Sequence, residues 1–141
     1  DPGDDLSVSC RPDALALFNP VLVLAPIPGM GDGVRLLKPR MDVSPADLSP
    51  YHHLEAGAPP SILFHGTEDA TVPFPLIEAF RAKSVSLGNR CELVAYEGQL
   101  HGFFNFERMN SVIFFDTMYR LDAFLVSLGY LEGLPEIKHL R

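Results

Sequence analysis

Short apolar segments that end at polar turns dominate the pattern of this chain. Three of them are interpreted as strands: Asp13 to Phe18, Ser61 to Phe64 and Cys91 to Tyr96. The apolar run in the first of them is typical of a strand buried on both faces of a parallel sheet. The last two run directly into turns that carry acids or a histidine. The pattern therefore predicts a short parallel sheet of about three strands, with polar groups at the ends of its strands.

Two other segments carry apolar residues at helical spacing. One begins after the turn at Val72-Pro73 and ends at Gly88-Asn89, and the other ends at Gly129. Their apolar stripes are Leu76, Ile77, Phe80 and Leu87 in the first and Phe114, Met118, Leu121, Leu125 and Leu128 in the second. Strands that alternate with helices in this order predict an α/β fold with right-handed βαβ connections.

Prolines divide the chain into two unequal halves, because all but one of the 13 lie before residue 76. Proline interrupts both helix and sheet hydrogen bonding, so we expect the first half to be rich in loops. Residues 19–48 are predicted to form a long loop. A short helix is predicted to begin at Ser49-Pro50, with serine as its cap and proline at the first helical position.

Composition narrows the class of protein. The 141 residues suit one globular domain, and 47% hydrophobic content argues against disorder. The 11 basic and 18 acidic residues give a net charge of −7, which argues against nucleic acid or an anionic membrane as a partner. The sequence contains neither a signal-like segment nor an apolar run long enough for a membrane span, and it leaves the compartment open.

An acid and a histidine follow two of the predicted strands. Asp69 lies in the turn after Ser61 to Phe64, with Glu68 as the rival acid, and His101 follows Cys91 to Tyr96 in a glycine-flanked loop. An acid that orients an imidazole forms two members of a nucleophilic triad. The ordinary alternative for Asp69 is a turn residue that accepts backbone N–H groups, and for His101 a solvated loop residue.

The third member of a triad is not evident. A serine nucleophile on a strand-to-helix turn usually lies in the pattern G-x-S-x-G. Glycines four residues apart occur here with Gly31, Leu100 and Leu131 at their centres, and none of these is a nucleophile. Ser7 and Ser9 lie nearest to the expected position, but they and Cys10 lack the glycine-flanked turn or the preceding strand, so each is interpreted as an ordinary loop residue.

Several motifs in order resemble the C-terminal half of an α/β-hydrolase. The likeness is to the esterase and lipase branch that includes acetyl-xylan-esterase-like carboxylesterases, and it extends from about Arg11 to Tyr130. The motifs are Ser49-Pro50, Gly57-Ala58-Pro59-Pro60, His65-Gly66-Thr67-Glu68-Asp69 with Val72-Pro73, and Tyr96-Glu97-Gly98 with His101-Gly102-Phe103. The resemblance implies that Asp69 is the catalytic acid and His101 the catalytic base.

The resemblance also implies that the chain, which begins with Asp1, is one partial domain spanning residues 1–141. In that family the nucleophile turn and the oxyanion-hole loop lie upstream of the matched motifs. We therefore expect the chain to carry only the aspartate and histidine of a triad and to be inactive alone. The strand at 13–18 would then have an unpaired edge, which predicts a homodimer or higher oligomer formed there.

The remaining chemistry-bearing residues receive ordinary interpretations. Phe103 and Phe104 either line an acyl pocket or belong to the core. His65 is interpreted as a packed, hydrogen-bonded histidine, and His52, His53 and His139 as surface residues. Cys10 and Cys91 are too far apart in sequence to indicate a pair and favour free thiols. We expect no metal site and no cofactor, because these histidines and cysteines lack ligand spacing.

Three functions remain open at this point. The resemblance favours hydrolysis of short-chain carboxylic esters, including acetylated sugars, by a serine, histidine and aspartate. A second hypothesis is a catalytically incomplete module that binds or oligomerises. A third is a peptidase domain of the prolyl-oligopeptidase type, which shares the same acid and histidine arrangement and which fold alone does not distinguish.

Overall fold

A computed structural model describes residues 3–5, 7–30, 43–107 and 111–135. Along these residues the elements follow the order β1 (Leu15–Phe18), β2 (Ser61–Gly66), α1 (Phe74–Ser86), β3 (Cys91–Tyr96) and α2 (Val112–Ser127). The three predicted strands and the two helices predicted from apolar stripes are confirmed, and the boundaries of β3 are those that the sequence predicted. The predicted loop agrees with 19–30 and 43–48, whereas 31–42 lies outside the described residues.

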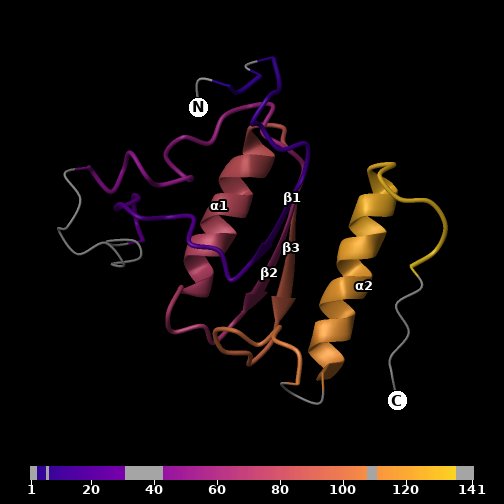
Figure 1. Ribbon diagram of the computed structural model, residues 1–141. Helices are drawn as coiled ribbons and strands as arrows, with labels where there is room; N and C mark the ends of the chain where they lie inside the picture. Colours follow the sequence, from indigo (N-terminus) through magenta and orange to yellow (C-terminus); the bar gives the residue numbers. More distant parts are fainter. Residues whose placement is uncertain (1–2, 6, 31–42, 108–110, 136–141) are drawn as a thin grey trace.

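The three described strands form one parallel sheet in the order β1-β2-β3. Leu15 is level with Ser61, which is level with Cys91, and Phe18 is level with Phe64 and then Val94. All three strands therefore end at the same edge of the sheet (Figure 1). The predicted α/β fold with about three parallel strands is confirmed, and this edge is where the polar turns meet.

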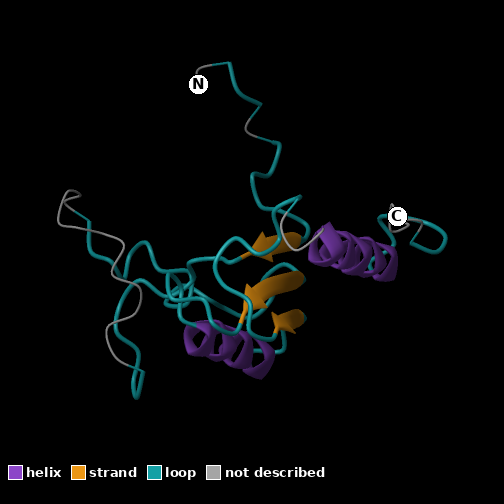
Figure 2. Ribbon diagram, turned by 90° about the horizontal axis from the view of Figure 1, so that it is seen from below, coloured by secondary structure: helices purple, strands orange, loops and turns teal. Residues whose placement is uncertain are grey.

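The two helices cover opposite faces of the sheet (Figure 2). Alternate residues of β2 explain this arrangement, since successive side chains of a strand point to opposite faces. Leu63 packs with Leu76, Ile77 and Phe80 of α1 in one core cluster. Ile62 and Phe64 pack with Phe103 and Phe124 in the other. Because β2 is buried along its whole length, it is the centre of the fold.

One local prediction is wrong: no helix begins at Ser49-Pro50. Residues 49–53 form hydrogen-bonded turns, with the His52 N–H donating to the Ser49 carbonyl at 2.9 Å. The Ser49 side chain is fully buried, where its hydroxyl accepts the Leu24 N–H at 3.0 Å. Ser49 therefore fastens the preceding loop and is not available to cap a helix.

Among the described residues, no helix is long and apolar enough to cross a membrane. Cys10 is exposed and Cys91 is buried, and both are free thiols. The described part of the chain also contains no cluster of three or more histidine, cysteine or acidic residues that could hold a metal ion.

Candidate active site

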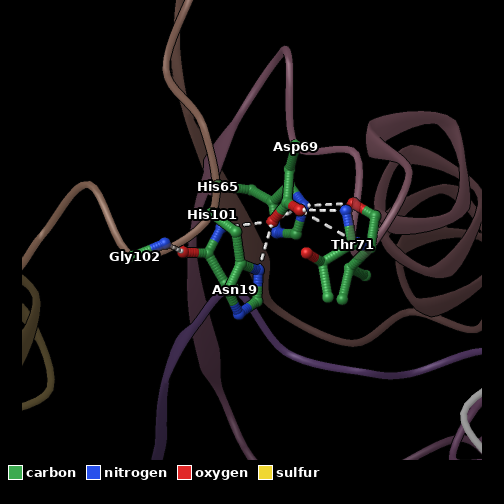
Figure 3. Close-up of polar contacts among 7 residues, drawn as sticks. Asn19, His65, Asp69, Thr71, His101 and Gly102 are labelled. Carbon is green, nitrogen blue, oxygen red and sulfur yellow. Dashed lines mark hydrogen bonds and ion pairs between the residues drawn. The ribbon is translucent and has the colours of Figure 1, made fainter.

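The turns after β2 and β3 meet at the carboxyl edge of the sheet, and the residue after β1 joins them. Asp69 comes from the turn after β2, His101 from the turn after β3, and Asn19 directly follows β1. Figure 3 shows the side chains of Asn19 and His101 beside the Asp69 carboxylate. Parallel register brings together residues that lie 32, 50 and 83 positions apart in the sequence.

Both oxygens of the Asp69 carboxylate accept hydrogen bonds. Oδ1 accepts the backbone N–H groups of Thr71 and Val72, at 2.8 and 2.9 Å. Oδ2 accepts the Nδ2–H of Asn19 at 2.9 Å and faces Nδ1 of His101 at 2.8 Å. The residue is 4% exposed, so these bonds take the place of water around the carboxylate. The carboxylate is thereby held in one orientation.

The surroundings of Asp69 keep it ionised. Burial alone would raise its pKa, but the hydrogen bonds from Val72, His101 and Thr71 outweigh burial and lower the pKa below its ordinary value. An ionised carboxylate can only accept hydrogen bonds. Nδ1 of His101 must therefore carry the proton that it shares with Asp69.

This assignment fixes the chemistry of the opposite ring nitrogen of His101. In a neutral imidazole only one nitrogen carries a proton, so Nε2 holds the free lone pair. No hydrogen bond joins Nε2 to any residue in the described part of the chain, and the His101 side chain is 45% exposed. A base with an oriented ring and an accessible lone pair can remove a proton from a nucleophile.

Backbone contacts hold the two turns against each other. The N–H groups of Thr67 and Glu68 donate to the carbonyls of Tyr96 and Gln99, at 3.0 and 3.1 Å. A Cβ added to Gly66 would lie 2.2 Å from the Gln99 carbonyl oxygen. Real Cβ atoms do not approach that closely, so the spacing between the acid turn and the base turn requires glycine at this position.

His65 lies on the inner side of the same carboxylate. Its side chain is fully buried, with Nε2 2.8 Å from the Val72 carbonyl oxygen and 3.3 Å from Oδ2 of Asp69. Burial lowers the pKa of His65, and this effect outweighs the hydrogen bond to Val72 and the charge of Asp69, both of which would raise the pKa. The neutral ring donates from Nε2, and its Nδ1 has no hydrogen-bond partner among the described residues. His65 is thus the packed, hydrogen-bonded histidine that the sequence predicted.

The other candidate residues lie apart from this contact. Glu68 is exposed, and the acid that meets His101 is its neighbour Asp69. Ser7 donates to Asp5 and Ser9 accepts the Arg11 N–H, both within the exposed N-terminal segment. The structure therefore brings Asp69 and His101 together and leaves these two serines in local turns.

Phe103 and Phe104 pack into the fold behind His101. Phe103 is 3% exposed and belongs to the core cluster of Ile62 and Phe64, and Phe104 packs against the same cluster. Of the two roles that the sequence left open, the core role describes these contacts. Contact with a substrate remains a prediction for both residues.

Asn19 is the polar contact that sequence analysis missed. Its position directly after an apolar strand and before Pro20 was the available signal, because the carboxyl ends of parallel strands share one edge. Its partners could not be named without the register of β1 on β2.

Comparison with solved structures identifies the architecture. The apo form of esterase 2 from Thermogutta terrifontis superposes with a TM-score of 0.83 and 44% identity, over 94% of this chain and 48% of that chain. The propionate-bound form gives the same TM-score and identity over 49% of its length, and the sarin-phosphonylated form gives 0.84 and 44% over 50%. The fold is that of part of an α/β-hydrolase esterase. The family resemblance predicted from the motifs is confirmed.

A weaker relative agrees with the esterase assignment of the fold. The probable isoprenylcysteine alpha-carbonyl methylesterase ICMEL1 of Arabidopsis thaliana is 33% identical over 70 residues, which are 50% of this chain and 14% of that protein. No protein-family model matches the chain. The chain spans about half the length of the esterase structures that it matches.

Proposed function

We propose that this chain supplies the acid and the base of a serine-type ester hydrolysis. The observation that carries the proposal is the contact of 2.8 Å between Nδ1 of the half-exposed His101 and Oδ2 of the buried Asp69. His101 would take the proton of a nucleophile through Nε2 and return it to the leaving alcohol. Asp69 would hold the ring and stabilise its charged form.

The nucleophile and the oxyanion-hole donors are proposed to come from a segment other than the matched motifs. Two observations support this. No serine of the described residues hydrogen-bonds to His101, and the esterase structures are about twice as long as the part this chain covers. Alone, the chain would then hold an acid and a base without a group to activate.

Short-chain carboxylic esters are the proposed substrates. The similar esterase from Thermogutta terrifontis has been solved bound to propionate and bound to butyrate, both short carboxylates. It also reacts with paraoxon, and organophosphorus compounds form covalent adducts with activated nucleophiles. These findings concern that enzyme and support the same class of acyl group for this chain.

The test measures hydrolysis of aryl acetate, propionate and butyrate by a polypeptide that joins this chain to a nucleophile-bearing segment. His101→Ala and Asp69→Asn should each lower turnover by about 10²- to 10⁴-fold. The matched control is His53→Ala, because exposed His53 contacts only the Ala46 carbonyl through its ring among the described residues. Turnover that survives His101→Ala would exclude the proposed base.

Labelling of the 141-residue chain with a fluorophosphonate tests the origin of the nucleophile. The expected result is no adduct from folded protein, because the reagent marks serines that a base activates. A single adduct on one serine of this chain would show that the nucleophile lies within it.

The turnover assay of the joined polypeptide also tests the class of substrate. Hydrolysis of acetylated xylose would indicate a sugar esterase, and hydrolysis of an aminoacyl-proline amide would indicate a peptidase.

An assembly role has one structural observation in its favour. β1 pairs only with β2 in the described sheet, and its residue Ala16 is exposed. We propose that the chain alone forms a homo-oligomer through this edge, as an unpaired strand favours. Ala16→Lys should then convert the oligomer to a monomer in light scattering, whereas a monomer without the substitution would exclude this role.

A further inference from the structure

We propose that Asn19 is a positioning residue for the acid and base pair. The proposal rests on the proposed function and adds to it a third side chain, which directly follows β1. One amide side chain meets both partners, since Nδ2 donates to Oδ2 of Asp69 at 2.9 Å and Oδ1 accepts the Gly102 N–H at 3.0 Å. Gly102 is the residue that follows His101.

The two bonds connect the acid with the backbone of the base. Oδ2 of Asp69 is also the atom that faces Nδ1 of His101, so Asn19 and His101 converge on one oxygen (Figure 3). An Asn amide is a planar group of fixed size, with a donor at one end and an acceptor at the other. It therefore sets the distance between the carboxylate and the His101 turn.

The position of Asn19 is itself fixed from the sheet. Its backbone N–H donates to the Phe64 carbonyl of β2 at 2.9 Å, and the residue is 5% exposed. The bridge is thus anchored to the central strand and protected from exchange with water. A buried amide with both ends bonded is stabilised in one orientation.

The backbone of Asn19 points to the same conclusion. Its φ is 43°, in the left-handed region that few residues other than glycine adopt. Asparagine tolerates this region better than most residues, yet the residue before a proline prefers extended backbone. Unfavourable backbone conformations persist where surrounding contacts determine them and concentrate at functional sites. Here the conformation turns the side chain toward Asp69 and Gly102.

Two substitutions separate the side chain from the backbone. Asn19→Gly removes both bonds while allowing the positive φ without strain. Asn19→Asp keeps the shape and an acceptor for the Gly102 N–H, but places a carboxylate oxygen against Oδ2 of Asp69 and so removes the donor. Both variants leave the core residues of β2 unchanged, and amide protection of Ile62 and Leu63 by hydrogen exchange checks that each variant is folded.

The measurement is NMR of the 141-residue chain, with ¹⁵N labelling to read the tautomer of His101 and the exchange of its Nδ1 proton. We expect the unsubstituted chain to show the Nδ1–H tautomer with a hydrogen-bonded proton signal. Asn19→Gly and Asn19→Asp should both lose that signal at neutral pH. The Gly102 amide should lose its protection in Asn19→Gly and keep it in Asn19→Asp.

Each outcome decides the proposal. If both folded variants retain the Nδ1–H signal, Asn19 does not position the pair, and the proposed function stands without it. If only Asn19→Gly loses the signal, Asn19 acts through Gly102 alone and the two-sided bridge is wrong. If the unsubstituted chain lacks the signal and Asp69→Asn changes nothing, the acid and base pair and the Asn19 proposal fall together.

Discussion

Two histidines face the same carboxylate oxygen of Asp69, one from the end of β2 and one from the base turn after β3, and they differ in burial and in what their ring nitrogens contact. His65, at the end of β2, is fully buried, and its Nε2 donates to the Val72 carbonyl. His101 is half-exposed, and its Nδ1 is 2.8 Å from Oδ2 of Asp69. Proximity to a carboxylate therefore does not identify a base; the accessibility of the opposite nitrogen does.

The means of support differ as well. In the acid turn, Oδ1 of Asp69 is held by N–H groups of its own turn, those of Thr71 and Val72, and only Oδ2 is held by Asn19 from outside. The base turn depends on groups from elsewhere, including Asn19 after β1 and Thr67 after β2. Because the acid is rigid and neighbouring segments hold the base turn, the imidazole of His101 can be exposed to solvent and still keep its orientation.

The largest expected effect comes from removing each of the two histidines in turn. His101→Gln should lower ester turnover by about 10³-fold in a polypeptide that contains the nucleophile, with stability nearly unchanged because the side chain is half-exposed. His65→Leu should instead lower stability and leave the turnover per folded molecule nearly unchanged. It leaves the buried Val72 carbonyl unpaired, which costs about 1–3 kcal/mol of unfolding free energy. Turnover per folded molecule and urea unfolding measure the two effects. Equal losses of turnover in the two variants would contradict the assignment of His101 as the base and His65 as a structural residue.

A second prediction concerns the anchor of the base turn. Phe103→Ala should lower the free energy of unfolding by about 3–5 kcal/mol, because Phe103 is 3% exposed in the core cluster. Phe106→Ala is the matched control, since Phe106 is 56% exposed. Thermal and urea unfolding of both variants give the measurement. A small loss at Phe103 would favour the alternative role in an acyl pocket.

A third prediction concerns the spacing between the turns. Gly66→Ala should cost about 1–3 kcal/mol and displace the base turn, because the new Cβ would meet the Gln99 carbonyl at 2.2 Å. Amide chemical shifts should change most at Glu68, which donates to that carbonyl. Gly3→Ala is the control, as no atom lies within 4 Å of the added Cβ. Unchanged shifts at Glu68 would contradict the close approach.

The smallest effect is the pH dependence of stability. The lowered pKa of His65 means that the unfolded chain binds more protons just below its ordinary pKa of 6.5, so stability should fall as pH decreases from that value. The lowered pKa of Asp69 predicts a second decline below about 3.8. Urea unfolding from pH 7.5 to 3 measures both declines. The first should be absent from His65→Leu and present in His53→Ala.

The sequence predicted most of the fold because its apolar pattern agrees with local structure. The short apolar segments correspond to β1, β2 and β3, and the stripe of Leu76, Ile77 and Phe80 forms the buried side of α1. Ser49-Pro50 shows where this reasoning ends. The same dipeptide that can cap a helix here buries its hydroxyl against Leu24, and that contact depends on a loop packing that no local pattern records.

The candidate site shows a similar division. Asp69 and His101 were proposed from motifs, and the structure brings their side chains into contact, while their roles remain to be tested. Asn19 was not proposed, because its importance depends on the register of β1 beside β2 and on a backbone with φ of 43°. Local sequence predicts which residue types follow a strand; three-dimensional register decides which of them meet.

The order of the strands has a consequence for how the site assembles during folding. The bond of Asn19 to Asp69 spans 50 residues and requires β1 to lie beside β2, and its bond to Gly102 spans 83 residues and requires β3 to be in place as well. Contacts so distant in sequence incur their loop-closure entropy late and slow the folding of parallel sheets. The two-sided bridge of Asn19 would therefore be among the last contacts to form, and the Nδ1 proton signal of His101 that depends on it would report that the three described strands are aligned.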